Sequence, residues 1–470
     1  MKVENKSFWA VLFLGIVLLT LQLENITLRA VDAPIYASMG KELLAKTLID
    51  WAQITWRGGV GFYDNPHFTP WLIAVSFKLF GVSAFAAALP IVIISIFSII
   101  AIFFLGREIV NERFAILCML ALILCPQFLK DGRNPMLEPA IMFFTTISIY
   151  FGIKSLSEKN VPYALLGGFS TAFAFLSKGP MSFLSFGVIP AFFMILNLID
   201  KNSKFKCSLK DFIKYFSLFI LSFILLLAIV DLWHYLVFHQ SFLKLYYQER
   251  LTKTLGFQGT TTYRMNMNHF YYINLLLKKY WPWIPLCIIS PIFFFRKNKT
   301  EFRPALILGL LITFGYLIPF SFITFKASWY INIMHVCLAL LSAVTLYQIK
   351  HNNLIEQKLP LIILSISIVI LFLSSTYPTI FLNKRPFHQF LIQVSRTIKP
   401  PIVKGSLCST IITDPWPFEF LNRFYLGQSP SNCNDGKTYD YRLIDFSKTK
   451  ISNEEIIIFA NHPYALLKTN

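Results

Sequence analysis

The sequence predicts an all-α membrane protein with about eleven transmembrane helices, interfacial helices in its first outer loop and a small α/β domain at its C-terminal end. Of its 470 residues, 55% are hydrophobic, 16% are aromatic and only 14% are charged. A soluble domain of this size carries far more charge. Apolar runs of about 17 to 24 residues recur along most of the chain, and each can cross roughly 30 Å of hydrocarbon as a helix.

The apolar runs define the order of the predicted spans. The first run ends in Leu23-Glu-Asn without a small-residue cleavage site, so we expect a retained helix and not a signal peptide. The spans are predicted at 8–28, 83–106, 113–129, 136–153, 162–177, 180–198, 215–238, 280–295, 304–321, 329–348 and 359–376.

The charges between the spans predict the orientation. Alternate loops are rich in lysine and arginine, as in Lys201–Lys214 and Arg296–Arg303, and the positive-inside rule makes these loops cytoplasmic. The opposite set is then exocytoplasmic: 29–82, 130–135, 178–179, 239–279, 322–328 and the tail from about 377. The formal net charge of +19 therefore serves topology and contact with anionic lipids, and it does not support nucleic-acid binding.

Two outer segments have their own predicted structure. In the first outer loop, 29–82, apolar residues spaced by three and four over 34–51 predict an amphipathic helix on the membrane surface, and 66–80 predict a second one. The second large outer loop, 239–279, is rich in Tyr, Thr, Arg and Asn and is expected to be a partly mobile loop over the same face.

The chain changes character after the last predicted span. Proline punctuation and short β-like runs at 406–412 and 455–459 predict that 377–470 form a soluble exocytoplasmic α/β domain, separate from the transmembrane domain 1–376. Cys408 and Cys433 are the only cysteines in this tail, so an oxidising compartment would allow a disulfide between them, and two unpaired thiols are the alternative.

Two carboxylates at the outer face are candidate catalytic residues. Asp32 lies a few residues after the first span and just before Pro34, so it is a candidate either for the helix N-cap or for a catalytic group facing a cavity. Glu138 lies one turn into a span, where an ionisable residue suggests function, with Arg133 as the expected partner. The alternative for Glu138 is an interfacial side chain or a pair with Lys130.

Several cations share the predicted outer face. Lys178 and Lys326 occupy very short outer turns, where a single lysine usually anchors a helix end but several beside carboxylates favour a phosphate-binding surface. Arg250, in the second large outer loop, adds positive charge to this face. His67 and the other histidines lack metal-ligand spacing, and no phosphate-binding glycine loop or zinc motif occurs. The pattern therefore favours an enzyme acting on a lipid-linked phosphate over nucleotide-driven chemistry.

Taken together, these segments resemble the GT-C glycosyltransferases of the protein mannosyltransferase and aminoarabinose (lipid A) transferase superfamily. The resemblance covers roughly 8–350 and depends on an ordered series of motifs, each weak alone. The matching positions are Asp32 with Tyr36, Asn65–Leu72, Lys78–Gly81, Arg133 with Glu138, Ser177–Pro180, Pro282-Trp283, Phe320-Ser321, Lys326 and Tyr330. The chain departs from the pattern at Ala33, where a second acid is frequent, at Asn65, where lysine is frequent, and at Glu138, where aspartate is usual.

The resemblance implies sugar transfer from a polyprenyl-phosphate donor to a lipid, glycan or protein acceptor at the outer face of a bacterial cytoplasmic membrane. Asp32 would accept the proton of the acceptor hydroxyl or orient it, and the sugar would invert in a direct displacement. Arg133, Lys178, Lys326 and Arg250 would hold the phosphate, with His67 and Tyr330 as further donor contacts. No metal is required, although Asp32 and Glu138 together can hold one divalent cation.

Two other functions fit the same composition. A transporter or flippase for a lipid-linked sugar would use the basic face as its path, but the spans show no duplicated halves and no matched pair of broken helices. A non-catalytic envelope assembly protein would use its tail to bind a partner. Transfer of a labelled sugar to an acceptor, or movement of the lipid without transfer, distinguishes the enzyme from the flippase.

The orientation can be tested by cysteine-accessibility labelling in intact cells. Single cysteines placed in 41–60 and 245–265 should react from outside, whereas those in 201–212 should react only after permeabilisation, because the basic loop is retained in the cytoplasm. Labelling of 201–212 in intact cells would reverse the orientation and move the predicted site to the other face.

Overall fold

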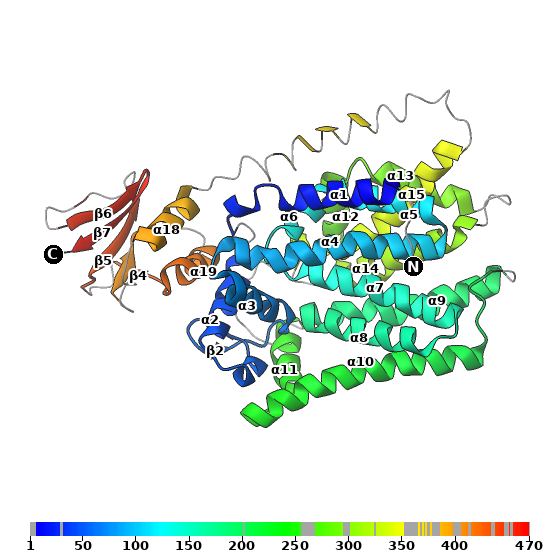
Figure 1. The fold of residues 1–470 in the computed structure, drawn as a ribbon, viewed down its shortest axis with the longest axis horizontal. Coiled ribbons are helices and arrows are strands. Elements are labelled where there is room, and N and C mark those ends of the chain that lie inside the picture. Colours follow the sequence, from blue (N-terminus) through cyan, green and yellow to red (C-terminus); the bar gives the residue numbers. More distant parts are fainter. Residues whose placement is uncertain are drawn as a thin grey trace.

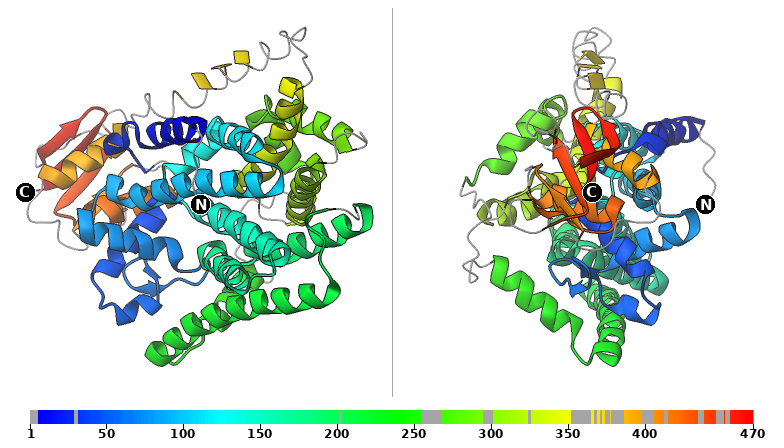
Figure 2. Two further views of the ribbon diagram at one scale, coloured as in Figure 1. Left: turned by 45° about the vertical axis from the view of Figure 1, so that its right-hand side comes forward. Right: turned by 90° about the vertical axis from the view of Figure 1, so that its left-hand side faces the viewer.

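The computed structural model is an elongated, mostly helical molecule with a small sheet at one end (Figure 1). Apart from a few single positions, it describes residues 6–28, 32–200, 203–254, 268–294, 301–323, 326–351, 386–397, 406–411, 415–433, 438–445 and 455–469. The long helices α4, α7 and α10 run roughly along the long axis, and the sheet lies beyond one end of them (Figures 1 and 2).

The helical bundle is built from the apolar segments. In chain order its helices are α1 (Lys6–Thr20), α4 (Ala84–Ile109), α5 (Glu112–Ile123), α6 (Pro126–Gly132), α7 (Glu138–Ser157), α8 (Val161–Lys178), α9 (Leu184–Ile199), α10 (Leu209–Phe238), α13 (Ile284–Ile289), α14 (Arg303–Phe322) and α15 (Met334–His351). Short 3₁₀ segments join some of them: η3 (Gly179–Phe183), η4 (Ser290–Phe294) and η6 (Ser328–Ile333).

The described helices include seven that are long and apolar enough to cross a membrane, or up to eight if one bent pair is a single span. Most of the predicted spans coincide with these helices. The segment predicted as 113–129 is instead bent by 70° between α5 and α6, because Pro126 begins a new helix there. The segment 280–295 forms only the short α13 and η4, and 359–376 lies almost entirely outside the described residues.

The segments predicted to be interfacial form helices at one end of the bundle. α2 (Ala33–Leu44) and α3 (Phe68–Phe80) flank η2 (Ile49–Ala52) and the hairpin of β1 (Thr55–Trp56) and β2 (Val60–Gly61). From the second large outer loop, α11 (Phe242–Thr254) lies at the same end (Figure 1), and α12 (Tyr271–Lys279) follows 255–267, which are outside the described residues.

α2 differs from the helix expected on the membrane surface because protein covers it. Its residues from Ala33 to Gly40 are all buried. Gly40 lies so close to Ile73 of α3 that a Cβ at this position would overlap the Ile73 side chain. The apolar face that the sequence directs toward lipid is therefore used to pack two helices of the same loop together.

The C-terminal part combines two helices with a five-stranded mixed sheet. α18 (Pro386–Thr397) and α19 (Pro415–Leu426) pack with strands in the order β4-β3-β5-β7-β6. β3 is parallel to its neighbours β4 and β5, whereas β7 is antiparallel to both β5 and β6. The strands are β3 (Leu407–Ser409), β4 (Ser431–Asn432), β5 (Tyr441–Asp445), β6 (Glu455–Asn461) and β7 (Tyr464–Thr469). The predicted small α/β domain is thus present.

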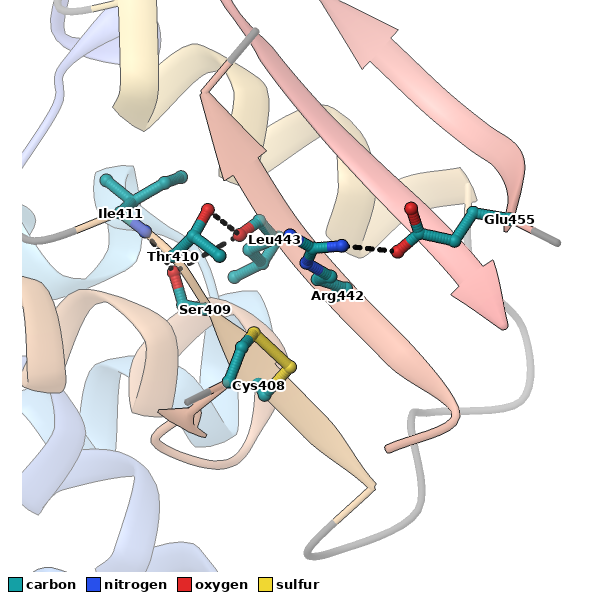
Figure 3. The surroundings of a disulfide bond; sticks show 8 residues. Cys408, Ser409, Thr410, Ile411, Arg442, Leu443 and Glu455 are labelled. Atoms are coloured by element: carbon teal, nitrogen blue, oxygen red, sulfur yellow. Dashed lines mark hydrogen bonds and ion pairs between the residues drawn. A yellow bond between two sulfur atoms is a disulfide. The ribbon is translucent and has the colours of Figure 1, made fainter. Parts of the chain in front are cut away.

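Cys408 and Cys433 are bonded to one another at the edge of this sheet (Figure 3). Cys408 belongs to β3, and Cys433 directly follows β4, its parallel neighbour. Figure 3 also shows the Arg442 side chain reaching from β5 to Glu455 of β6, with 2.9 Å between Nη1 and Oε1. The bond closes a loop of 25 residues that contains the whole of α19.

The disulfide should appear in protein purified without reductant. Non-reducing peptide mapping should yield one linked peptide containing Cys408 and Cys433. Removal of the disulfide should lower the free energy of unfolding of this domain by about 3 kcal/mol, because the unfolded chain regains the entropy of an open loop. Alkylation of both thiols in unreduced protein would disprove the bond.

Candidate active site

Asp32 directly precedes α2 but does not cap it with its side chain. The Asp32 carbonyl accepts a hydrogen bond from the Tyr36 amide at 3.1 Å, and the side chain makes no capping hydrogen bond. The carboxylate is therefore available to the space beside the helix. Of the two interpretations open in the sequence, this geometry fits a carboxylate that faces a site.

The surroundings of Asp32 raise its pKa above the ordinary value for an aspartate. Desolvation by burial raises the pKa of Asp32 to about 6, while the Lys178 ammonium acts in the opposite direction and Asp64 adds a smaller raising effect. The phenol of Tyr36, one turn into α2, is itself buried, and burial together with Asp32 raises its pKa well above the ordinary value. At neutral pH, Asp32 is thus a carboxylate of enhanced basicity beside a neutral hydrogen-bond donor.

Lys178 and Glu138 form a fully buried ion pair between the Lys178 Nζ and the Glu138 Oε1. Glu138 is the first residue of α7 and Lys178 the last of α8, so the pair joins the ends of two packed helices. The ammonium also lies 4.4 Å from the centroid of the Tyr330 ring in η6. The sequence predicted Arg133 as the partner of Glu138, and this prediction is wrong. The partner is Lys178, because α7 and α8 pack as a hairpin.

The second cation of the site comes from α11. The Arg250 Nη1 lies 3.0 Å from the Asp64 Oδ1, and this pair is about one quarter exposed. Arg250 also hydrogen-bonds the Tyr330 hydroxyl, which ties α11 to the ring that covers Lys178. Tyr246, one turn earlier in α11, rests its hydroxyl on Gly179, where a Cβ would overlap it. α11 is thus fixed directly over the end of α8.

Two predicted phosphate-binding residues, Arg133 and Lys326, have their described contacts elsewhere. Arg133 donates hydrogen bonds to the carbonyls of Leu18, Leu19 and Leu21, at 2.6 to 3.1 Å, so its guanidinium caps the end of α1. Lys326 donates to the Ile323 carbonyl, which follows α14, at 2.5 Å. These contacts match the helix-anchoring alternative better than a phosphate-binding surface.

His67 is buried among aromatic rings. Its ring lies 4.3 Å from that of Phe242 and 5.3 Å from that of Trp71. Burial lowers the pKa of His67 to about 3, with His234 adding to the effect, so the imidazole is neutral at physiological pH. It therefore adds no positive charge with which to hold a phosphate.

A divalent cation shared by Asp32 and Glu138 does not fit this arrangement well. In the part of the chain that the structure describes, no group of three or more His, Cys, Asp or Glu side chains could hold a metal ion. The Lys178 ammonium already occupies the position beside Glu138 that a cation would take. A lysine in that place neutralises the carboxylate without a metal.

Asp64 is the site residue that sequence reasoning missed. It stands directly before the Asn65–Leu72 motif, in the first outer loop, 29–82. An acidic residue next to that motif, on the same predicted face as Arg250 of the second large outer loop, was the available signal. Its partner could not be identified, because Asp64 and Arg250 are 186 positions apart in the chain.

The bundle also contains an apolar groove. It is a cavity of about 530 Å³ between α3, α4 and α7, and its lining includes Phe68, Val75, Ile93 and Phe144. Phe68 lies 5.1 Å from Phe144, ring centroid to centroid. Phe68 is four residues after Asp64, and Phe144 is six residues after Glu138 in α7, so two residues of the groove lining are close in the chain to two of the charged residues.

Comparison with known proteins agrees with this architecture. Residues 64–233 match the sequence profile of the family described as dolichyl-phosphate-mannose-protein mannosyltransferase. An uncharacterized protein of Aquifex aeolicus (strain VF5) is 24% identical over 332 residues, which are 69% of this chain and 62% of that protein. The match thus spans less than two thirds of the length of that relative.

Solved structures show the same fold over nearly the whole chain. ArnT from Cupriavidus metallidurans, crystallised with undecaprenyl phosphate, superposes with a TM-score of 0.68 over 98% of both chains at 14% identity. The oligosaccharyltransferase of Archaeoglobus fulgidus superposes with a TM-score of 0.56 over 94% of this chain and 70% of that one at 12% identity. The chain is therefore a multi-pass membrane protein with the GT-C fold of membrane glycosyltransferases.

Proposed function

We propose that this protein transfers a sugar from a polyprenyl-phosphate donor to a hydroxyl-bearing acceptor, a lipid A-like lipid, a glycan or a protein. The site faces the outside of a bacterial cytoplasmic membrane in this proposal. The observation that carries it is the meeting of a carboxylate of raised pKa, Asp32, with two cations, Lys178 and Arg250, in a bundle that also contains an apolar groove. The likeness to a GT-C structure that holds undecaprenyl phosphate supports this class of donor.

Asp32 is suited to the role of general base. The acceptor hydroxyl must lose a proton as it attacks the anomeric carbon, and a base is most effective when its pKa lies near the working pH. Burial brings the pKa of Asp32 to about 6, close to this range. Direct attack on the side opposite the leaving phosphate inverts the anomeric centre.

Arg250 and Lys178 are suited to stabilise the leaving phosphate. Charge builds up on the phosphate oxygens as the sugar bond breaks, and fixed cations stabilise that charge most when water is excluded. Each cation has a carboxylate partner in the structure, Asp64 and Glu138 respectively. The Arg250 pair is partly exposed, so its guanidinium can turn toward a phosphate at lower cost than the fully buried Lys178.

The apolar groove gives the donor lipid a path away from the site. Its lining is almost entirely apolar, which suits a polyprenyl chain and excludes the sugar. Phe68 and Phe144 of its lining are close in the chain to Asp64 and Glu138, so in this proposal a phosphate held by Arg250 extends its lipid into the groove.

Asp32→Asn should lower sugar transfer at least about a hundredfold while the protein still folds, because the amide cannot accept the proton. In the wild type, kcat/KM should fall about tenfold for each pH unit below about 6, as protonation removes the base. Transfer of a radiolabelled sugar from a polyprenyl-phosphate donor measures both. Near-normal activity of the variant would assign Asp32 a structural role only.

Ile93→Trp should obstruct the groove. KM for a long-chain donor should rise roughly tenfold, equivalent to losing contact with about two methylene groups, whereas kinetics with a short-chain donor should not change. Leu225→Trp is the matched control, because Leu225 is exposed on α10 away from the groove lining. The groove would be excluded as the lipid site if Ile93→Trp and Leu225→Trp changed KM equally. An unchanged KM of Ile93→Trp for the long-chain donor would exclude it as well.

The same purified protein in sealed vesicles distinguishes the enzyme from a flippase. Transfer to an added acceptor supports the proposal. Movement of the lipid-linked sugar across the bilayer without transfer would replace it with transport.

A further inference from the structure

The C-terminal domain touches the helix that carries the candidate base. α19 packs directly against α2, and Figure 1 shows α19 between the sheet and the end of the bundle where α2 and α3 lie. α2 is thus held from two sides, by α3 at Gly40 and by α19. The N-terminal end of this clamped helix carries Asp32 and Tyr36.

Lys41 makes the most specific of these contacts. Its Nζ donates a hydrogen bond to the Phe424 carbonyl at 2.6 Å, in the last turn of α19. The last carbonyls of a helix lack partners within the helix and carry partial negative charge, so an ammonium there is doubly favourable. Lys41 is nine residues from Asp32 on the same rigid helix, which transmits a displacement of one end to the other.

Aromatic contacts extend the interface around Lys41. Trp56 of the hairpin stacks on Phe420 at 5.8 Å between ring centroids, and Phe77 of α3 lies 6.0 Å from Phe424. Phe420 and Phe424 are fully buried by these contacts. Arg57 adds a more exposed ion pair to Glu419 at 3.1 Å, which contributes little because water screens it.

The disulfide fixes both ends of the segment that carries α19. Cys408 and Cys433 lie on or next to neighbouring strands, and α19 is enclosed between them. A helix anchored in a sheet in this way is a firmer support than one on a free tail, since the bond reduces the conformations that the segment can reach.

We infer, on the basis of the proposed function, that α19 is a positioning element for the reaction: it holds α2 so that Asp32 and Tyr36 stay in register with the site, and Lys41 is the positioning residue. Asp32 touches the reacting atoms in this scheme, and Lys41 acts only through α2. A displacement of about 1 Å in a catalytic group can cost about a hundredfold in rate, so this support affects turnover more than donor binding.

Lys41→Met in the full-length protein tests the inference, because methionine keeps an apolar side chain of similar length but removes the donor. Hydrogen exchange followed by mass spectrometry should be at least about threefold faster in 33–44 and unchanged in 138–157. The kcat for sugar transfer should fall about tenfold while KM for the donor changes less than about twofold. Lys41→Arg should restore both, because arginine can reach the same carbonyl.

Two further samples make the result decisive. The Cys408→Ser, Cys433→Ser double variant, or folded wild type treated with a thiol reductant, should show the same faster exchange in 33–44. Arg57→Gln should show almost no increase in exchange in 33–44. Unchanged exchange in 33–44 in both Lys41→Met and the disulfide-free protein would overturn the inference. If the wild type transfers no sugar, the proposed function fails, yet faster exchange confined to 33–44 would still establish the support of α2 by α19.

Discussion

The buried ion pair between Lys178 and Glu138 is the interaction on which the rest of the site depends. Both side chains are almost fully removed from solvent, and leaving either charge alone there would cost roughly 3–5 kcal/mol. The pair therefore fixes the end of α8 against the start of α7. Tyr330 of η6 covers the same ammonium, so a third segment takes its position from this pair.

The backbone turn after Lys178 allows α11 to approach the buried ion pair. Gly179 has a φ of +69°, a conformation that favours glycine, and the hydroxyl of Tyr246 occupies the space where a side chain would lie. α11 can therefore approach the end of α8 closely enough for Arg250 to reach Asp64 and Tyr330. One turn with a lysine and a glycine thus organises both cations of the candidate site.

The balance of charge in this cluster explains how it can be both stable and reactive. Lys178 and Arg250 each form an ion pair with a carboxylate, whereas Asp32 forms none within the part of the chain that the structure describes, and burial raises its pKa. A cluster in which every carboxylate were paired would be more stable but would hold no base.

The sequence by itself determined the membrane class, most of the spans, the helices of the first outer loop and the small α/β domain, because apolar length and periodicity are local properties. It also predicted Asp32, Glu138, Lys178, Arg250 and Tyr330 as candidate site residues, and the structure places their side chains near one another. Only the tertiary structure decided that Lys178 pairs with Glu138, that Arg133 caps α1 and that Asp64 faces Arg250. The physical reason is that such pairings depend on which helices pack side by side, and that depends on contacts between distant segments that no local pattern contains.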